Sequence, residues 1–325
     1  AWKANCFLLR SVRQNDSQYE WRLAVRRRCA LIALAIVCCF PAVAAAAGAG
    51  GAPDLRALVT DASDTTEQII AALRRRYSRV VVSSDPAAIA AQHGTGIVLT
   101  IGPGALEAAL SARISAPIVS LFTSTQEFDR ITGPAHRPDV TAIYAEASPV
   151  SQLRLISKLY GRPVSVAVLE TPATAGSLAL LRAAATAQNV TLTPISVAEG
   201  DNVLRVLARS APFDVLLIRP DRGLYAKEGI RGILESTYRR RQGVIGFSTA
   251  LVQAGILAAS FANLDDTFDH LDEVINSIAQ TGLVPPPQYP LYWRVAINDS
   301  VARSLGLVVD EAVRLLRTRP PGRSQ

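Results

Sequence analysis

The chain has 325 residues, with 34 basic and 27 acidic side chains and a formal net charge of +7. Seven of the basic and two of the acidic residues lie in residues 1–47, so the rest of the chain is close to neutral. This distribution argues against a nucleic-acid-binding protein, because such proteins concentrate basic residues on their folded domain. The four cysteines also precede residue 48, which excludes a disulfide framework, a thiolate metal site and a cysteine nucleophile from the remainder. They are Cys6, Cys29, Cys38 and Cys39.

Residues 26–47 have the layout of a secretory signal. Three arginines at 26–28 precede an apolar run from Cys29 to Phe40, and small residues that suit a signal peptidase follow at 42–47. The same stretch is about long enough to span a membrane, so a retained anchor is the alternative. We expect cleavage and export to the periplasm, with residues 1–22 as an extension that carries no fold signal.

From residue 54 onward, apolar stretches of strand length alternate with amphipathic stretches. The first half has a helical pattern at 65–77 and a short one after Gly102-Pro103-Gly104. The expected strands of this half are 55–61, 80–83, 96–101, 117–123 and 141–145.

The second half repeats the rhythm. The continuous apolar run at 164–169 is typical of a parallel strand that is buried on both faces. The other expected strands are 192–197, 213–218, 244–247 and 292–297. The expected helices are 148–160, 174–189, 202–210, 227–241, 251–261, 264–282 and one that starts at 299.

Two successive β–α series imply an α/β fold with two doubly wound parallel-sheet lobes and a hinge. We assign residues 54–146 to an N-terminal α/β lobe and 147–288 to a C-terminal α/β lobe. Residues 289–325 form a crossover segment and tail in this scheme.

Ligands of open α/β sheets bind beyond the carboxyl ends of the strands. Hydroxyls and helix N-terminal amides there suit an anion, an acidic side chain suits an ammonium group, and an arginine suits a carboxylate. Several of these residues have a simpler interpretation as helix N-caps, turn glycines or solvated loop carboxylates. The candidate ligand-binding residues are Asp61, Gly102, Gly104, Thr123, Ser124, Glu146, Glu170, Arg219, Asp221 and Ser248.

Sequence patterns of catalysis and metal binding are missing. His93, His136 and His270 lack metal-ligand spacing, and we expect each of them at the surface. The chain has no G-x-S-x-G nucleophile motif and no phosphate-binding P-loop. We therefore expect no enzymatic activity, no cofactor and no metal site.

The most specific pattern lies in the C-terminal third. It consists of GVIGFSTALVQAGILAAS at 243–260, LDDTFDHLDEVINSIAQTG at 264–282 and WRVAINDSVARSLGLVV at 293–309. These segments resemble the ABC-type solute-binding family typified by tryptophan- and tyrosine-binding lipoproteins. In that family a strand-end serine, here Ser248, precedes an AL-x-x-AG helix, a long helix and a closing V-I-N-x-x-x-A-x-x-L-G-L segment. Weaker likenesses extend the resemblance to about 54–309.

The resemblance implies a periplasmic-binding-protein type I fold, in which two hinged lobes close on a solute. It implies a monomeric periplasmic protein of an ABC importer that binds a small solute, such as an amino acid or a related carboxylate. Its expected partner is an ABC permease or another inner-membrane protein. Residues 123–131 (TSTQEFDRI) depart from the family's DPV-x-AG stretch, so the aromatic amino-acid pocket is not carried over. The alternative is a ligand sensor or adaptor of the same fold that acts without transport.

Overall fold

The computed structural model describes residues 54–92, 96–133, 137–172, 174–221, 223–224 and 227–319. These residues belong to one compact unit, and the side chains of residues 227 and 228 are not described. The expected secretory signal, His93 and His136 lie outside the described residues.

The first sheet has five parallel strands in the order β2-β1-β3-β4-β5. All residues of β1 and β3 are buried, because helices cover both faces of the sheet. The strands are β1 (Leu55–Val59), β2 (Val81–Ser83), β3 (Ile97–Ile101), β4 (Ile118–Thr123) and β5 (Val140–Tyr144). The helices between them are α2 (Asp64–Arg76), α3 (Pro86–Ala90), α4 (Pro103–Ser111) and α5 (Thr125–Thr132).

The second sheet has seven strands in the order β12-β11-β10-β9-β8-β6-β7. It is parallel from β7 to β10, and β11 and β12 add antiparallel pairs at one edge. The strands are β6 (Val164–Glu170), β7 (Val190–Ser196), β8 (Val215–Leu217), β9 (Gly243–Gly246), β10 (Ala258–Phe261), β11 (Trp293–Ile297) and β12 (Arg317–Thr318).

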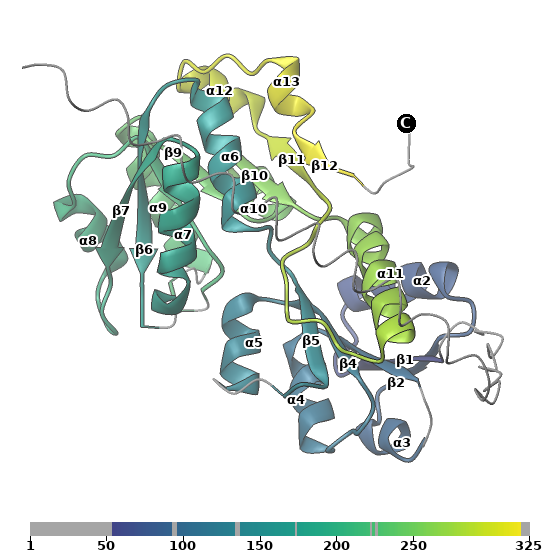
Figure 1. Cartoon of the computed structure of the whole chain (residues 1–325). Helices are drawn as coiled ribbons and strands as arrows, with labels where there is room; N and C mark the ends of the chain where they lie inside the picture. Colours follow the sequence, from purple (N-terminus) through teal and green to yellow (C-terminus); the bar gives the residue numbers. More distant parts are fainter. Residues whose placement is uncertain are drawn as a thin grey trace, which may run out of the picture. The chain divides into compact units, whose positions relative to one another are not determined.

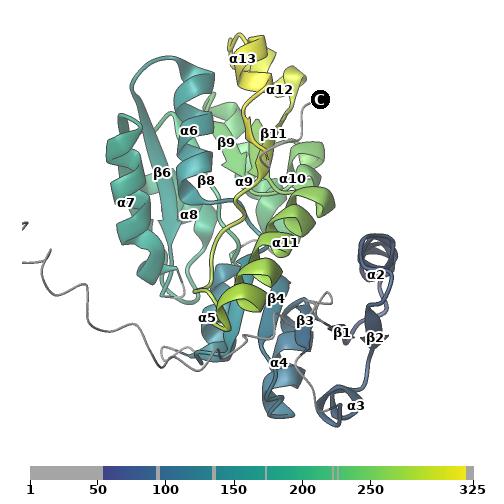
Figure 2. The ribbon, with the colours of Figure 1, turned by 45° about the vertical axis from the view of Figure 1, so that its right-hand side comes forward.

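Helices also cover both faces of the second sheet. The helices α6 and α7 lie against one face, together with the C-terminal helices α12 and α13 (Figure 2). The other face packs against α8, α9 and α10. The helices are α6 (Pro149–Tyr160), η1 (Ala175–Ser177), α7 (Leu178–Ala187), α8 (Val203–Arg209), α9 (Lys227–Arg239), α10 (Thr249–Ala254), α12 (Asp299–Ser304) and α13 (Glu311–Arg314).

One long helix, α11 (Leu264–Thr281), follows the second-sheet strand β10 but packs on the first sheet (Figure 1). Phe268, Leu271 and Ile275 of this helix are buried against β1, β3 and β4. Residues 147–288, which the sequence assigned to one lobe, therefore supply core residues next to both sheets.

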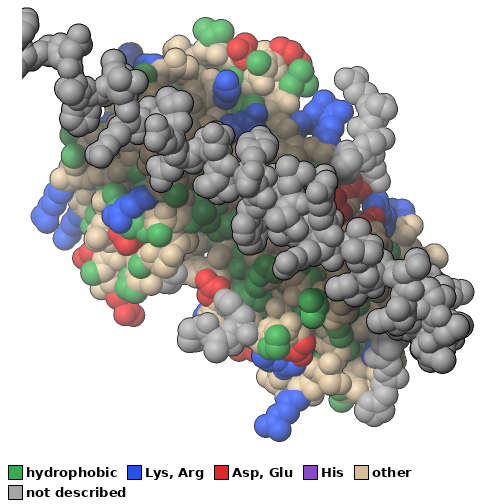
Figure 3. Space-filling model, in the orientation of Figure 1, with side chains coloured by type: hydrophobic (Ala, Val, Ile, Leu, Met, Phe, Trp, Pro, Cys, Tyr) green, Lys and Arg blue, Asp and Glu red, His purple; other side chains and the backbone are tan. Residues whose placement is uncertain are grey.

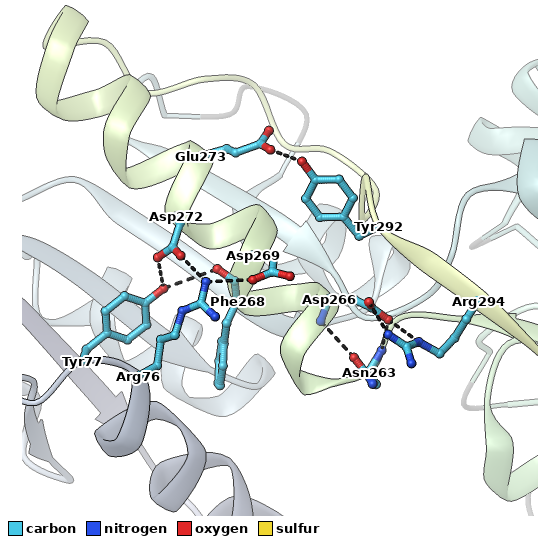
Figure 4. Close-up of polar contacts among 10 residues, drawn as sticks. All are labelled: Arg76, Tyr77, Asn263, Asp266, Phe268, Asp269, Asp272, Glu273, Tyr292 and Arg294. Atoms are coloured by element: carbon cyan, nitrogen blue, oxygen red, sulfur yellow. Dashed lines mark hydrogen bonds and ion pairs between the residues drawn. The ribbon is translucent and has the colours of Figure 1, made fainter. Parts of the chain in front are cut away.

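The chain passes between the two sheets three times: after β5, after β10 and before β11. In the third passage Gln288 lies beside β5, where its carbonyl accepts from the Tyr144 N–H and its N–H donates to the Ala142 carbonyl. Polar contacts fix α11 to this passage and to β11 (Figure 4): Tyr292 donates to Glu273, and Arg294 of β11 forms an ion pair with Asp266.

A second group of contacts fixes α11 to α2 (Figure 4). Arg76 pairs with Asp269 at 2.7 Å and with Asp272, and the Tyr77 hydroxyl donates to Asp272 at 2.7 Å. These bonds join segments almost 200 residues apart in the sequence.

The predicted α/β class with two doubly wound sheets is confirmed. One predicted element is wrong: a helix at 251–261 is instead α10 followed by strand β10. Gly255, at φ 115°, ends the helix in a conformation that glycine adopts at little cost. The apolar residues that follow fill the space between β9 and β11, so tertiary packing overrides their local helix preference.

One further expectation needs correction, and one helix was not predicted. His270 is buried on α11, where its Nδ1 accepts from the Leu291 N–H at 3.3 Å, and does not lie at the surface. Residues 125–132 form α5, which the apolar pattern did not predict because the helix buries only Glu127 and Phe128. No helix among the described residues is long and apolar enough to cross a membrane.

Candidate ligand-binding cleft

A cleft lies among residues that follow strands of both sheets. Its empty space is about 540 Å³, including the part that is open to solvent. The lining combines carboxylate, amide, hydroxyl and guanidinium groups with one tyrosine ring. It consists of Thr125, Gln126, Asp129, Glu146, Ala147, Pro149, Gln152, Gly176, Ser177, Arg219, Pro220 and Tyr289.

Glu146 is the buried acid of the cleft, just beyond the end of β5. Its side chain is only 7 % exposed. One oxygen, Oε1, accepts from the Thr125 N–H at 2.9 Å and from the Thr125 hydroxyl. The other oxygen, Oε2, is buried and has no hydrogen-bond partner among the described residues. Burial raises the pKa of Glu146, against the opposing effects of the Thr125 donors and of Arg219.

The N-terminus of α5 positions the Thr125 donors. Ser124 caps this helix by accepting from the Glu127 N–H at 3.2 Å. The N–H of Thr125, at the first helical position, has no partner within the helix and is free to bond the carboxylate. The positive end of the helix dipole also favours an anion at this place.

Arg219 enters the cleft from the second sheet, two residues beyond β8. Its Nη2 donates to the Ser177 hydroxyl at 2.5 Å and to the Thr174 carbonyl at 3.2 Å. The Ser177 hydroxyl in turn donates to the same carbonyl at 2.9 Å. These bonds hold the half-buried guanidinium group over the turn η1.

Three aromatic rings pack together beside the cleft, and one of them, Tyr289, lines it. The rings of Tyr289 and Tyr144 meet edge to face with centroids 5.1 Å apart, and Phe128 packs on Tyr144 at 5.8 Å. Burial raises the pKa of Tyr144 and of Tyr289, so both phenols are neutral near pH 7. Tyr289 lines the cleft from the third passage between the sheets, which brings a residue of this connection into the site.

Two of the ten predicted ligand-binding residues, Glu146 and Arg219, line this cleft. Ser124 and Thr123 directly precede its lining residue Thr125. Thr123 is buried, and its hydroxyl accepts from the Ser120 hydroxyl at 2.9 Å.

The other six predicted residues also lie at or beyond strand ends, but none of them is part of the lining. Asp61 accepts from Ser63 and Thr66 at the start of α2, and Ser248 caps α10. Asp221 accepts from Thr171 and from loop N–H groups. The remaining three are Gly102, which caps α4 at φ 82°, Gly104, which lies against Thr60, and the half-buried Glu170.

Several lining residues escaped the sequence analysis. Thr125 and Asp129 lie on α5, whose Ser124 cap was the one available signal. Gln152 lies inside α6 and is 2 % exposed, and no local pattern separates it from a core residue. Tyr289 lies far from the other lining residues in the sequence, and only the third passage of the chain brings it into the cleft.

The charges of the protein are mixed in sign. On the face drawn in Figure 3, both basic and acidic side chains are visible among polar and apolar ones. The described part of the chain has no group of three or more His, Cys, Asp or Glu residues that could hold a metal ion.

No known family model matches the sequence, and no curated protein matches it. The structure resembles a ligand-free, open substrate-binding protein with adhesive properties from Clostridium difficile, with a TM-score of 0.58 and 13% identity over 81% of this chain and 98% of that one. It resembles an ABC domain in complex with L-Trp from Streptococcus pneumonia, with a TM-score of 0.53 and 16% identity over 80% and 97% of the two chains.

A conserved domain protein from Vibrio cholerae has a TM-score of 0.53 and 19% identity, over 81% of this chain and 97% of that chain. At these identities the similarity concerns the fold. The chain therefore has the two-lobed, periplasmic-binding-protein type I-like fold.

Proposed function

We propose that this protein is an extracytoplasmic solute-binding protein of an ABC-type importer, which encloses a small polar solute between its two lobes. The observation that carries the proposal is the cleft, to which the first sheet supplies the buried Glu146 and the second sheet supplies Arg219. A site assembled from both sheets changes its geometry when the sheets move relative to each other.

The connections between the sheets support a hinge mechanism. Three passages of the chain are few enough to bend, and hinge closure around a ligand is a common motion of two-lobed binding proteins. Tyr289 lies in the third passage and lines the cleft, so closure would bring its ring onto the solute.

The polar groups support a small charged or zwitterionic solute. Arg219 suits a carboxylate, because a guanidinium group forms strong, charge-assisted hydrogen bonds with carboxylate oxygens. Of the similar structures, one was solved with L-Trp and another is described as a substrate-binding protein. We extend this role to the present chain together with its partner, a membrane permease.

The test is thermal unfolding of the full chain with a panel of amino acids, small carboxylates, sugars and phosphate. At least one solute should raise the Tm, since a ligand that binds only the folded state stabilises it. Arg219→Ala should reduce the shift, while Arg182→Ala, an exposed arginine on α7, should leave it unchanged. A panel without any shift would contradict the proposal, and binding without permease-dependent uptake would favour a sensor.

A further inference from the structure

We infer that the cleft takes a solute with an ammonium group, and that Oε2 of Glu146 accepts a hydrogen bond from that group. The inference rests on the proposed solute-binding function and names the class of solute.

The first argument is the missing partner of Glu146. Five buried side-chain atoms of the described residues lack a hydrogen-bond partner, and of these only Oε2 of Glu146 belongs to a residue that lines the cleft. Buried polar atoms are nearly always bonded in folded proteins, and each exception calls for an explanation. A solute in the cleft would supply the partner.

The second argument is that Glu146 acts as an acceptor. The N–H and the hydroxyl of Thr125 both donate to its other oxygen, and both donors stabilise the ionised carboxylate. In its ionised form the carboxylate has no hydrogen to donate, so a solute group that bonds this form at Oε2 must be a donor.

The third argument separates a cationic donor from a neutral one. A buried carboxylate is costly unless a positive charge compensates it, and a hydroxyl cannot provide that charge. The only described cation of the lining, Arg219, donates to Ser177 and Thr174. The lining also holds two acids, Glu146 and Asp129. The ring of Tyr289 adds a surface that attracts cations.

Proton release follows from the same geometry. The titratable and charged groups that interact with Glu146 are Arg219, Tyr144 and Tyr289, and Asp129 interacts with both tyrosines. In the empty cleft, burial raises the pKa of Glu146, and an ammonium group at Oε2 would lower it again. Binding therefore releases a proton at any pH at which Glu146 is protonated in the free protein. The affinity for an amine should then rise with pH, by up to about tenfold per unit, until Glu146 is ionised.

The experiment uses matched probes on the full chain. Each L-amino acid is paired with its 2-hydroxy acid, and putrescine, D-ribose and inorganic phosphate complete the set. Calorimetric titration in two buffers of different ionisation enthalpy measures both affinity and proton release. The amino compounds should bind with proton release at acidic pH, and their hydroxy counterparts should bind at least tenfold more weakly.

The variant test is Glu146→Gln. It keeps an oxygen for Thr125 but replaces Oε2 by an amide that cannot accept, so amine binding should weaken roughly 10–100-fold. Glu107→Gln, an exposed glutamate on α4, is the matched control and should leave affinity unchanged.

Two outcomes would overturn the inference, and they differ in what else they contradict. Equal binding of hydroxy acids, or binding of ribose or phosphate alone, overturns the ammonium assignment and leaves the solute-binding function intact. Absence of any binding contradicts both.

Discussion

Replacing Glu146 by glutamine should stabilise the empty protein at neutral pH. The carboxylate is 7 % exposed, and one of its oxygens has no partner among the described residues. A buried polar atom without a partner costs about 1–3 kcal/mol, and a charged one costs more. Glutamine removes the charge while it keeps an acceptor for Thr125. For a chain of this size the gain corresponds to a Tm increase of roughly 2–4 °C per kcal/mol.

The effect has a defined pH dependence. The pKa of Glu146 in the folded protein lies above its ordinary value of 4.5. Between these two values the folded state retains a proton that the unfolded state has lost, so the stability of the wild type falls as pH rises through this window. The glutamine variant lacks this contribution. The stability of the variant relative to the wild type should be only slightly higher near pH 4. This difference should grow as pH rises through the window and then stay constant.

Thermal unfolding of the ligand-free proteins, followed by circular dichroism at pH 4, 5.5 and 7, measures this difference. Glu107→Gln, at a glutamate whose side chain is 60% exposed, should change the Tm little at any pH. A Glu146→Gln variant that is less stable than the wild type at pH 7, or equally shifted at every pH, would refute the reasoning.

Two variants test the contacts of α11 with its surroundings. Phe268→Ala removes a ring that is 2 % exposed in the core of the first sheet, and it should lower the free energy of unfolding in urea by about 3–5 kcal/mol. The control is Leu283→Ala, at a residue that is 72% exposed, which should change this free energy by no more than about 0.5 kcal/mol. Arg294→Ala leaves the buried carboxylate of Asp266 without its ion pair and should lower stability by about 1–3 kcal/mol. If Arg294→Lys were as stable as the wild type, the paired bonds at 2.8 and 2.6 Å would add nothing beyond the charge.

The parallel strands could be predicted because their burial dictates their composition. A strand such as β6, which is covered on both faces, must be apolar throughout, and its sequence shows this directly. Strand β10 could not be separated from the helix before it, since its small apolar residues suit both structures. Its identity depends on pairing with β9 and β11, which lie elsewhere in the sequence.

The candidate site could be predicted only in part for the same reason. Glu146 and Arg219 follow strand ends, and the rule that ligands bind beyond the carboxyl ends of strands finds them. Tyr289 reaches the cleft because Gln288 bonds to β5, a contact between segments more than 140 residues apart. The burial of His270 likewise depends on the packing of α11 against the first sheet. Most residues near His270 in the sequence are polar, so they do not indicate this burial.

The most direct test of the account is a crystal structure of the full chain with the first solute that raises its Tm. The account predicts the solute between the two sheets, with a donor group on Oε2 of Glu146 and an acidic group, where it has one, on Arg219. A solute bound outside the cleft, with Glu146 still lacking a partner, would contradict it.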